Sequence, residues 1–537
     1  AVAPYNSQIE AVNQLVGATF PRQTLKDTSG ASMMDPKTQV TRVHNISILD
    51  ATKHSVEANL VMALIREYPD EYSEKLANIA FNAYVNLNGD PILVASDASR
   101  QAGNSPNTVL SSALGILGKN RVDKAQKVVE ALIEAFQHSG ITDPSDPKAD
   151  YTSQLKTADK KAILADEEGD SRAKLMIKAI DQLSGRSVFV DFVKDLAKDS
   201  GQELSSDTLL AAIATTVGWS SLMRKRLSKM TLINIPWYFM LYSTMVGASV
   251  KGERHTADSF VGVSNEEIST SWSFGETSFL SIVGRKPNKE ELFSFSVLMG
   301  LIISNGPGTI SAQGAKGAVS ADGPEDPLRV QINKAFLGFM THTGFAHGGN
   351  GYEAMAFLLD QFKNKGVKDP GNKGHKINLA EIATKYAKDY KNYKKLQKEV
   401  GNISYGKIPC VNHPVFKNKE VNYDPREVYV KELFEKQGSY NIFHDFYQEL
   451  VQALYKTGVS KNVYCVNVDA VIAVILLKIL WAPYIAGQFK EEDLETSAFT
   501  AFLYGRMMGC AAEIEDHINR GRNMDTRTPA SQCSYVN

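Results

Sequence analysis

Apolar residues recur at three- and four-residue spacing along most of this chain, and this periodicity limits the possible folds more than any other feature. Clear examples are 128–136 (VVEALIEAF) and 357–362 (FLLDQF). The alternation of apolar and polar residues that is typical of half-buried strands is scarce. We therefore expect a mainly α-helical protein, whose helices end at polar or Gly/Pro-rich stretches such as 138–151 and 364–376.

The size and charge of the chain narrow its class further. Its 537 residues exceed the length at which one hydrophobic core normally stops growing, so at least two folding units are expected. Hydrophobic residues at 43% and charged residues at 22% are ordinary for a water-soluble protein. With 59 basic and 60 acidic residues, nothing steers the whole molecule toward nucleic acid or a membrane surface. Any anionic ligand is expected to be held by local arginines.

Cysteine and histidine usage bears on redox compartment and metals. The 4 cysteines are too scattered for a disulfide scaffold or a paired-cysteine zinc site, and the 10 histidines show no ligand-like spacing, so no metal is expected. A reducing compartment is favoured: the cytoplasm, or the mitochondrial matrix if a presequence was removed before Ala1. The most apolar run, 463–486, contains Asp469, Lys478 and Pro483, which favours a buried helix over a membrane span.

The first and second halves of the chain also resemble each other in sequence. Ordered matches between its halves include Trp, Gly, Asp and Arg residues, which helical periodicity alone does not align. The matched pairs are Arg172 with Arg426, Asp207 with Asp469, Trp219 with Trp481, Gly247 with Gly509 and His255 with His517. We therefore expect two tandem degenerate repeats, residues 1–262 and residues 263–537.

Two histidine segments of the second half carry side chains suited to chemistry. His347 lies in a glycine-flanked turn before a helical run, where small neighbours leave room for a ligand beside the imidazole. His413 precedes a basic loop that leads to Asp424-Pro-Arg426. This segment combines an imidazole that can polarise a carbonyl with a guanidinium that can grip a carboxylate through two hydrogen bonds. A histidine that only stabilises its turn is the alternative for His347.

Two further segments place charged residues in apolar surroundings. Asp469, in Asn467-Val-Asp469, stands where a strongly apolar helix begins, so that burial would raise its pKa and make it a better base. A helix N-cap is its alternative role. Arg506, in Tyr504-Gly-Arg-Met-Met-Gly509, lies on an otherwise apolar helix, which indicates a paired charge or a bound anion.

Taken in order, these segments resemble the citrate synthase superfamily, including the citryl-CoA lyase module of ATP-citrate lyase. The resemblance begins at 277–292 (Thr-Ser-Phe-Leu to Glu-Glu-Leu) and covers residues 270–525. It implies a helical citrate synthase-like fold and an enzyme that condenses acetyl-CoA with oxaloacetate, or cleaves citryl-CoA by the reverse Claisen reaction. The coenzyme A thioester would be the substrate, with no bound cofactor.

The resemblance also implies roles for individual residues. His347 would polarise the thioester carbonyl, Asp469 would remove the methyl proton, and His413 would activate the keto carbonyl. The implied substrate-binding residues are Asn305, Arg426, Arg506 and Arg520. Arg520 resembles the arginine that reaches into a neighbouring subunit's site, with Arg522 as a second candidate, so a homo-oligomer of two or more chains is expected.

Departures from the family pattern leave an alternative open. Asn305 stands where the family has a histidine and cannot carry a charge. The first half lacks both histidines at the matching positions and is expected not to catalyse the reaction. The alternative is therefore a catalytically reduced scaffold or assembly protein. No glycine loop of the GxxxxGK[ST] kind is present, so ATP use by this chain is not expected.

Overall fold

The structure is a computed structural model that describes residues 29–164, 169–323, 326–402, 406–413 and 415–520. The elements of the first half are β1 (Ser32–Met34), β2 (Thr41–Val43), β3 (Ile46–Ser47), α3 (Ile48–Ala51), α4 (Val56–Ile65), α5 (Glu71–Ala83), α6 (Pro91–Gln101), α7 (Pro106–Ile116), η1 (Lys119–Arg121), α8 (Asp123–Phe136), α9 (Thr152–Thr157), α10 (Lys160–Leu164), α11 (Ser171–Ile180), α12 (Val188–Ser200), α13 (Ser206–Met223), α14 (Lys229–Ala248) and η2 (Gly252–Arg254).

The elements of the second half are β4 (Ser259–Phe260), β5 (Val263–Ser264), α15 (Asn265–Ser271), α16 (Phe274–Val283), α17 (Lys289–Leu301), α18 (Ile310–Asp322), η3 (Pro327–Arg329), α19 (Ile332–Thr341), α20 (Asn350–Phe362), α21 (Leu379–Glu399), α22 (Pro425–Lys436), α23 (Ile442–Lys456), α24 (Val468–Ile485) and α25 (Glu491–Arg520). The prediction of a mainly α-helical protein is confirmed.

The strands of the described ranges form two small antiparallel sheets. One has the order β1-β2-β3, with Ser32 opposite Val43 and Arg42 opposite Ser47. The other is the β4–β5 hairpin, in which Phe260 pairs with Val263. These strands have 2 or 3 residues each, too few for an alternating pattern to stand out in the sequence.

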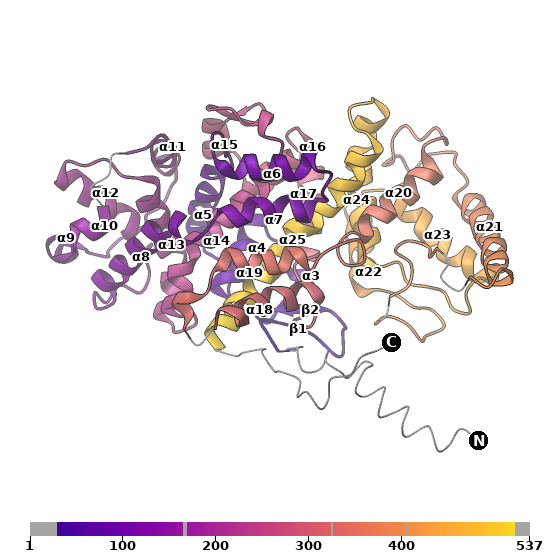
Figure 1. The fold of residues 1–537 in the computed structure, drawn as a ribbon, viewed down its shortest axis with the longest axis horizontal. Helices are drawn as coiled ribbons and strands as arrows, with labels where there is room; N and C mark the ends of the chain where they lie inside the picture. The colour runs from indigo at the N-terminus through magenta and orange to yellow at the C-terminus, as the bar shows by residue number, and fades with distance from the viewer. Residues whose placement is uncertain (1–28, 165–168, 324–325, 403–405, 414, 521–537) are drawn as a thin grey trace, which may run out of the picture.

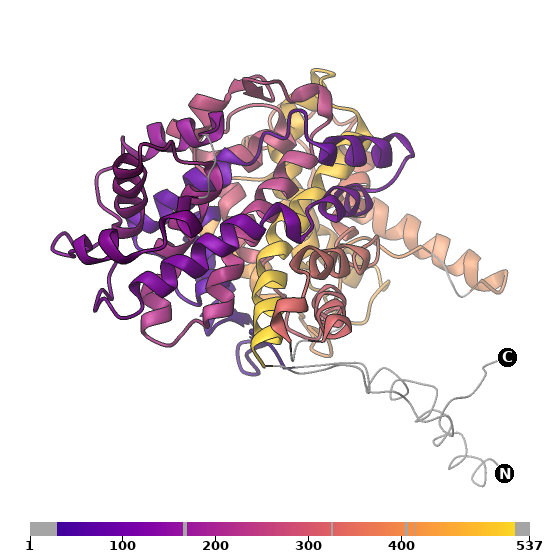
Figure 2. The same cartoon turned by 60° about the vertical axis from the view of Figure 1, so that its left-hand side comes forward.

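One hydrophobic core runs through both halves of the described chain. Helices α8–α13 lie at one end of the molecule and α20–α24 at the other, with α4, α14 and α25 between them (Figure 1). Helix α25, yellow in Figure 2, runs through this middle region and packs against α4 and α14 of the first half. The length of the chain suggested separate folding units, but the apolar side chains form a single contiguous cluster.

Helix α24 is the most apolar helix and carries Asp469 near its first turn. Asn467 is its N-cap, and its side chain accepts hydrogen bonds from the backbone of Asp469 and Ala470. By length and composition alone α24 could cross a membrane, but 61% of this apolar helix is buried inside the protein. This burial is the pattern of a core helix, as the interrupted apolar run predicted.

The helices of the two halves follow the same order and have similar lengths. Helices α4 and α16 both have 10 residues, α5 and α17 both have 13, and α13 and α24 both have 18. The indole of Trp219 in α13 donates a hydrogen bond of 2.8 Å to the carbonyl of Ile141, which follows α8. The indole of Trp481 in α24 donates one of the same length to Val367, which follows α20.

A reciprocal contact joins α7 and α19, which lie side by side across the two halves. The amide of Asn107, the second residue of α7, donates to the carbonyl of Thr343 beyond the end of α19 at 3.0 Å. The amide of Asn333, the second residue of α19, donates to the carbonyl of Leu114 in α7 at 3.3 Å. Each half thus uses an asparagine to bond the other half in the same way.

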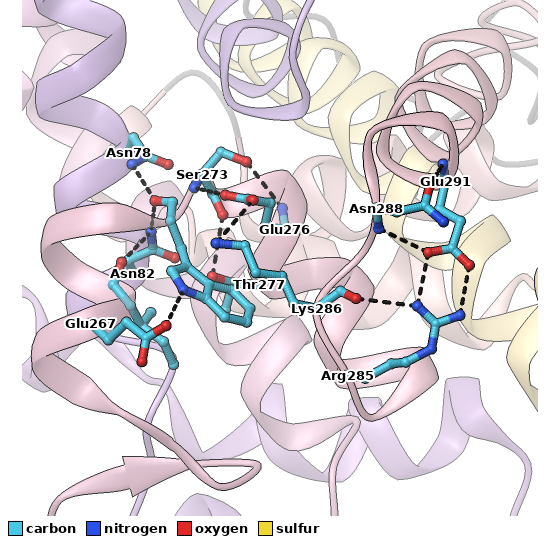
Figure 3. Close-up of polar contacts among 12 residues, drawn as sticks. Asn78, Asn82, Glu267, Ser273, Glu276, Thr277, Arg285, Lys286, Asn288 and Glu291 are labelled. Carbon is cyan, nitrogen blue, oxygen red and sulfur yellow. Dashed lines mark hydrogen bonds and ion pairs between the residues drawn. The ribbon is translucent and has the colours of Figure 1, made fainter.

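The segment that joins the halves is tied to the first half by buried polar contacts (Figure 3). The amides of Asn78 and Asn82 in α5 each donate to the carbonyl of Trp272 at 2.9 Å. Ser273 and Glu276 form a capping box at the start of α16, where each side chain bonds the other residue's backbone. A buried carbonyl that loses its donors costs free energy. Sliding α16 along α5 would take the Trp272 carbonyl away from both asparagines, so these hydrogen bonds hold the two helices in register.

Candidate active site

Asp469 lies in the first turn of α24 and is partly accessible, and since Asn467 is the N-cap, Asp469 is free of that role. Burial raises the pKa of its carboxyl, while Arg426, Arg506 and a hydrogen bond from the Asn350 side chain act in the opposite direction. The net effect is a raised pKa, because desolvation disfavours the charged form. A carboxylate of this kind is a stronger base than one in water.

His347 lies in a tight turn between α19 and α20, closed by hydrogen bonds between Gly344 and His347. Gly348 has φ 101°, and a Cβ there would lie 2.4 Å from the ring of Phe502 in α25, so only glycine fits. The His347 imidazole meets the Phe502 ring edge-on at 5.8 Å, and its Nε2 lies 2.9 Å from the Ser311 hydroxyl. Burial and the nearby Arg506 lower the pKa of His347 to about 3, so it is neutral at physiological pH.

His413 is held next to the start of α24 by paired backbone segments. The N–H of Asn412 donates to the carbonyl of Cys465 at 2.8 Å, and the N–H of Asn467 donates to the carbonyl of Cys410 at 3.1 Å. The His413 ring stacks on Phe416 at 4.8 Å. Burial lowers the pKa of His413, and Arg426 lowers it further, against the effect of Asp424.

The two buried arginines have different partners. Arg426 forms a two-pronged ion pair with Asp424, with Nε–Oδ1 at 2.9 Å and Nη2–Oδ2 at 2.6 Å. Its Nη1 donates to the Oδ1 of Asn305 at 3.4 Å. Arg506 donates from Nε to the carbonyl of Ile302 at 3.2 Å and lies over the Phe502 ring.

Arg506 also has an unsatisfied donor. Its Nη1 is buried and has no hydrogen-bond partner within the described residues. Burial lowers its pKa to about 10, so it remains charged at neutral pH. A buried guanidinium with an unused N–H costs free energy unless an anion completes it. The arrangement therefore suits a ligand carboxylate.

The structure brings six of the seven predicted site residues into one neighbourhood. Arg426 and Arg506 both lower the pKa of Asp469. Arg506 also lowers the pKa of His347, and Arg426 also lowers the pKa of His413. Arg426 in turn donates a hydrogen bond to Asn305. Arg520 lies elsewhere, at the end of α25, where it pairs with Asp516 at 2.7 Å and donates to the Ser29 hydroxyl at 2.7 Å. Arg522 falls outside the described residues.

Two residues beside the catalytic candidates had no role in the sequence interpretation. Ser311 contacts the His347 ring, and Asn350 bonds Asp469. Asn350 is the first residue of α20, three positions after His347, so its proximity to the site follows from the turn. Ser311 lies on α18, and nothing in its sequence surroundings indicates this contact.

The corresponding place in the first half is built differently. Asp207, like Asp469, is in the first turn of an 18-residue helix, and burial raises the pKa of its carboxyl. The ammonium of Lys124 in α8 lies 4.0 Å from it. The guanidinium of Arg172 lies over the Tyr84 ring at 4.3 Å. The charged groups that act on Asp207 are Lys124, Arg172 and Asp170, and no imidazole is among them.

Comparisons with known proteins give structural likenesses and no sequence match. No family model matches the chain, and no curated protein matches it. A ternary complex of citrate synthase from Thermoplasma acidophilum with carboxymethyl coenzyme A and oxaloacetate is 14% identical, with 96% of each chain covered and a TM-score of 0.48. Citrate synthase from Pyrobaculum aerophilum is 12% identical, with 95% of this chain and 92% of that chain covered and a TM-score of 0.48.

A shorter protein is similar as well. Citryl-CoA lyase from Hydrogenobacter thermophilus is 18% identical, covering 52% of this chain and 89% of that chain with a TM-score of 0.37. These likenesses to citrate synthases and to a citryl-CoA lyase are at 12%, 14% and 18% identity.

Proposed function

We propose that this protein is a citrate synthase-like enzyme that makes or cleaves a carbon-carbon bond between an acyl-CoA and a 2-oxo acid. Acetyl-CoA with oxaloacetate, or citryl-CoA in the reverse direction, is the preferred substrate. The observation that carries the proposal is the placement of Asp469 with a raised pKa beside two buried arginines, one of which also acts on the neutral His347.

The site residues supply each requirement of this chemistry. The α-proton of an acyl-CoA is weakly acidic, so Asp469 removes it only if the developing enolate oxygen receives a hydrogen bond, which His347 donates. The enolate carbon then attacks the keto carbon of the oxo acid, whose oxygen takes up a proton by way of His413. Arg426 and Arg506 bind the oxo acid's carboxylates. In the forward direction, water then hydrolyses the citryl-CoA thioester and CoA leaves as the thiol. In cleavage, His413 takes the hydroxyl proton of citryl-CoA as the same carbon-carbon bond breaks, and the protonated Asp469 gives its proton to the enolate carbon.

The proposal is tested by measuring oxaloacetate-dependent release of CoA from acetyl-CoA and cleavage of citryl-CoA by the purified chain. A panel of other acyl-CoA donors and oxo acids defines the preferred pair. His347→Gln should lower the rate at least about a hundredfold. His342→Gln is the matched control, because His342 is exposed at the end of the preceding helix. Absence of both activities in the unaltered chain would contradict the proposal.

Asn305 favours a second candidate, a catalytically reduced scaffold with a citrate synthase-like fold. Its neutral amide contacts Arg426, where the family resemblance leads us to expect a charged histidine. Calorimetric titration with oxaloacetate and with a CoA analogue separates the two candidates. An enzyme binds both ligands, whereas a scaffold shows no binding heat and forms stable higher-order assemblies.

We further propose that residues 1–262 and 263–537 are diverged copies of one unit, of which only the second is catalytic. The matching helix order, the Trp219 and Trp481 indole contacts and the reciprocal bonds of Asn107 and Asn333 support this view. A homo-oligomer in which Arg520 serves a neighbouring chain remains part of the proposal. Mass measurement in solution, with and without Arg520→Ala, tests it.

A further inference from the structure

A chain of hydrogen bonds links the buried Glu513 in α25 to the loop that carries Asn305. Glu513 is 1% exposed, and its Oε1 accepts a hydrogen bond from the backbone N–H of Ser32 at 3.0 Å and another from the Ser32 hydroxyl. The Ser304 hydroxyl donates to the Ser32 oxygen at 3.0 Å. The N–H of Gly306 donates to the Ser304 oxygen at 3.1 Å. Every donor in this chain thus points toward Glu513, and Asn305 lies between its last two members.

The direction of this chain depends on the charge of Glu513. Its Oε2 accepts a further hydrogen bond from the N–H of Ala31 at 3.1 Å, so three donors meet one carboxylate. An ionised carboxylate only accepts hydrogen bonds, so the Ser32 hydroxyl must donate to it, and the Ser32 oxygen is then the acceptor for Ser304. Burial raises the pKa of Glu513, while the hydrogen bond from Ser32 and the buried Lys316 act in the opposite direction. The carboxylate therefore orients both serine hydroxyls.

The same part of α25 also receives the segment before this loop. Gly505, Gly509 and Glu513 follow one another at intervals of four residues, which makes successive members neighbours on the helix surface. A Cβ at Gly505 would overlap the Ile302 side chain, and a Cβ at Gly509 would overlap the Ile303 carbonyl. The two glycines thus let this segment lie directly on the helix, and the carboxylate one turn further along bonds the loop by way of β1.

The residues that lead into strand β1 are held tightly between Glu513 and the loop. A Cβ at Gly30 would overlap the Glu513 carboxylate and would lie 2.8 Å from the Cβ of Pro307. The ammonium of Lys316 in α18 donates to the carbonyl of Ser29 at 3.0 Å, which ties down the residue before Gly30. This segment is therefore a fixed support for the loop, although it comes from the first half of the chain.

We propose that Glu513 is a positioning residue for oxo-acid binding. It acts through Ser32 and Ser304 to hold Asn305 in place. This inference rests on the proposed function, because it takes Asn305 as a residue that binds the oxo acid. The Oδ1 of Asn305 accepts a hydrogen bond from Arg426 at 3.4 Å, so the Nδ2 group is the donor left for a ligand oxygen. A hydrogen bond of this length has little tolerance for movement, since it is lost as soon as the loop shifts further from Arg426.

The test combines two measurements on the full chain, hydrogen exchange and calorimetric titration with oxaloacetate. In Ser32→Ala and in Glu513→Gln, the amides of residues 304–309 should exchange at least about tenfold faster, because the Ser304 hydroxyl loses its acceptor or its orientation. The Kd for oxaloacetate should rise at least about tenfold with an unchanged number of sites. A purely structural role would instead reduce the number of sites and keep the Kd. Met33→Ala changes the exposed neighbour of Ser32 in the same strand and should leave both values within about twofold.

A double variant tests whether the two residues act in one chain. Because Glu513 acts through Ser32, combining the two substitutions should add no more than about twofold to the effect of the more severe single one. Ser32→Ala removes only one hydroxyl, so it keeps the test valid if the buried Glu513 substitution impairs folding.

Three results would overturn the inference in a chain that binds oxaloacetate. They are unchanged exchange of residues 304–309 in Ser32→Ala, faster exchange with an unchanged Kd, and additive effects in the double variant. An unaltered chain that neither binds oxaloacetate nor acts on acyl-CoA substrates would overturn the proposed function itself, a result that is distinct from all three.

Discussion

Replacing Asp469 by asparagine keeps the shape of the side chain and removes the base. Among the described residues, the carboxyl group that raises the pKa of Asp469 is that of Asp424, and two hydrogen bonds hold this group on Arg426. Asp424 is thus not placed to take over proton removal. We expect the full loss of general-base catalysis, about 10²- to 10⁴-fold in kcat, which is about 2.7 to 5.4 kcal/mol in activation free energy.

The same substitution should not reduce stability. The folded-state pKa of Asp469 is raised, so on increasing pH the carboxyl ionises in the unfolded chain first. Stability contributed by the protonated form is therefore lost as pH rises through the folded pKa. At neutral pH the neutral asparagine avoids this cost, and we expect the free energy of unfolding of Asp469→Asn to equal or exceed that of the unaltered chain.

The first half supplies a matched control. Asp207 occupies the equivalent turn of α13, and burial raises the pKa of its carboxyl too, but Lys124 lies beside it and no imidazole acts on it. Asp207→Asn should keep the rate within about twofold. The assays are single-turnover citryl-CoA cleavage, CoA release and urea unfolding. Equal loss of activity in both variants, or retention of more than a tenth of the rate in Asp469→Asn, would refute this reasoning.

Three further predictions follow from the buried polar groups. Arg506→Met should raise the KM for the oxo acid at least about tenfold while leaving the thermal midpoint unchanged or higher, since the buried guanidinium has an unused N–H; a lower midpoint would contradict this. Asn107→Ala should cost about 1–3 kcal/mol in urea unfolding, because the buried carbonyl of Thr343 loses its donor, and Asn333→Ala should cost about 1 kcal/mol, because the Leu114 carbonyl keeps the N–H of Leu117; no effect from either of them would argue against a reciprocal contact. In a pH profile, kcat/KM should fall as pH drops through the raised pKa of Asp469, whereas His347, with a pKa of about 3, should add no limb near neutrality.

The helical fold could be predicted because its cause is local. Apolar residues at three- and four-residue spacing indicate which face of a helix is buried. The helices of the described chain lie where this spacing occurs in the sequence. The union of both halves in one core could not be predicted, because periodicity does not say which helix covers which face. Asn78 and Asn82 hold the junction through carbonyls that are remote in sequence, and such contacts leave no local signal.

The site was predictable to the extent that it depends on residue type within short motifs. Burial beside an apolar helix correctly indicated a raised pKa for Asp469. The partners that tune it come from other helices, as Arg506 does, or from the turn after His347, as Asn350 does. The contact of Ser311 with His347 depends on how α18 packs, and chain order alone does not give that geometry.

The reciprocal contact between α7 and α19 has a consequence for how this molecule can change. In an assembly of identical chains, every substitution at a twofold contact occurs twice. Here Asn107 and Asn333 belong to one chain and are encoded by separate codons, so each side of the contact can mutate alone. The same freedom applies away from the contact: Lys124 lies beside Asp207, while Asn350 lies beside Asp469. Lys124, which acts on Asp207 in the first half, thus has no lysine counterpart among the described groups that act most strongly on Asp469 in the second half.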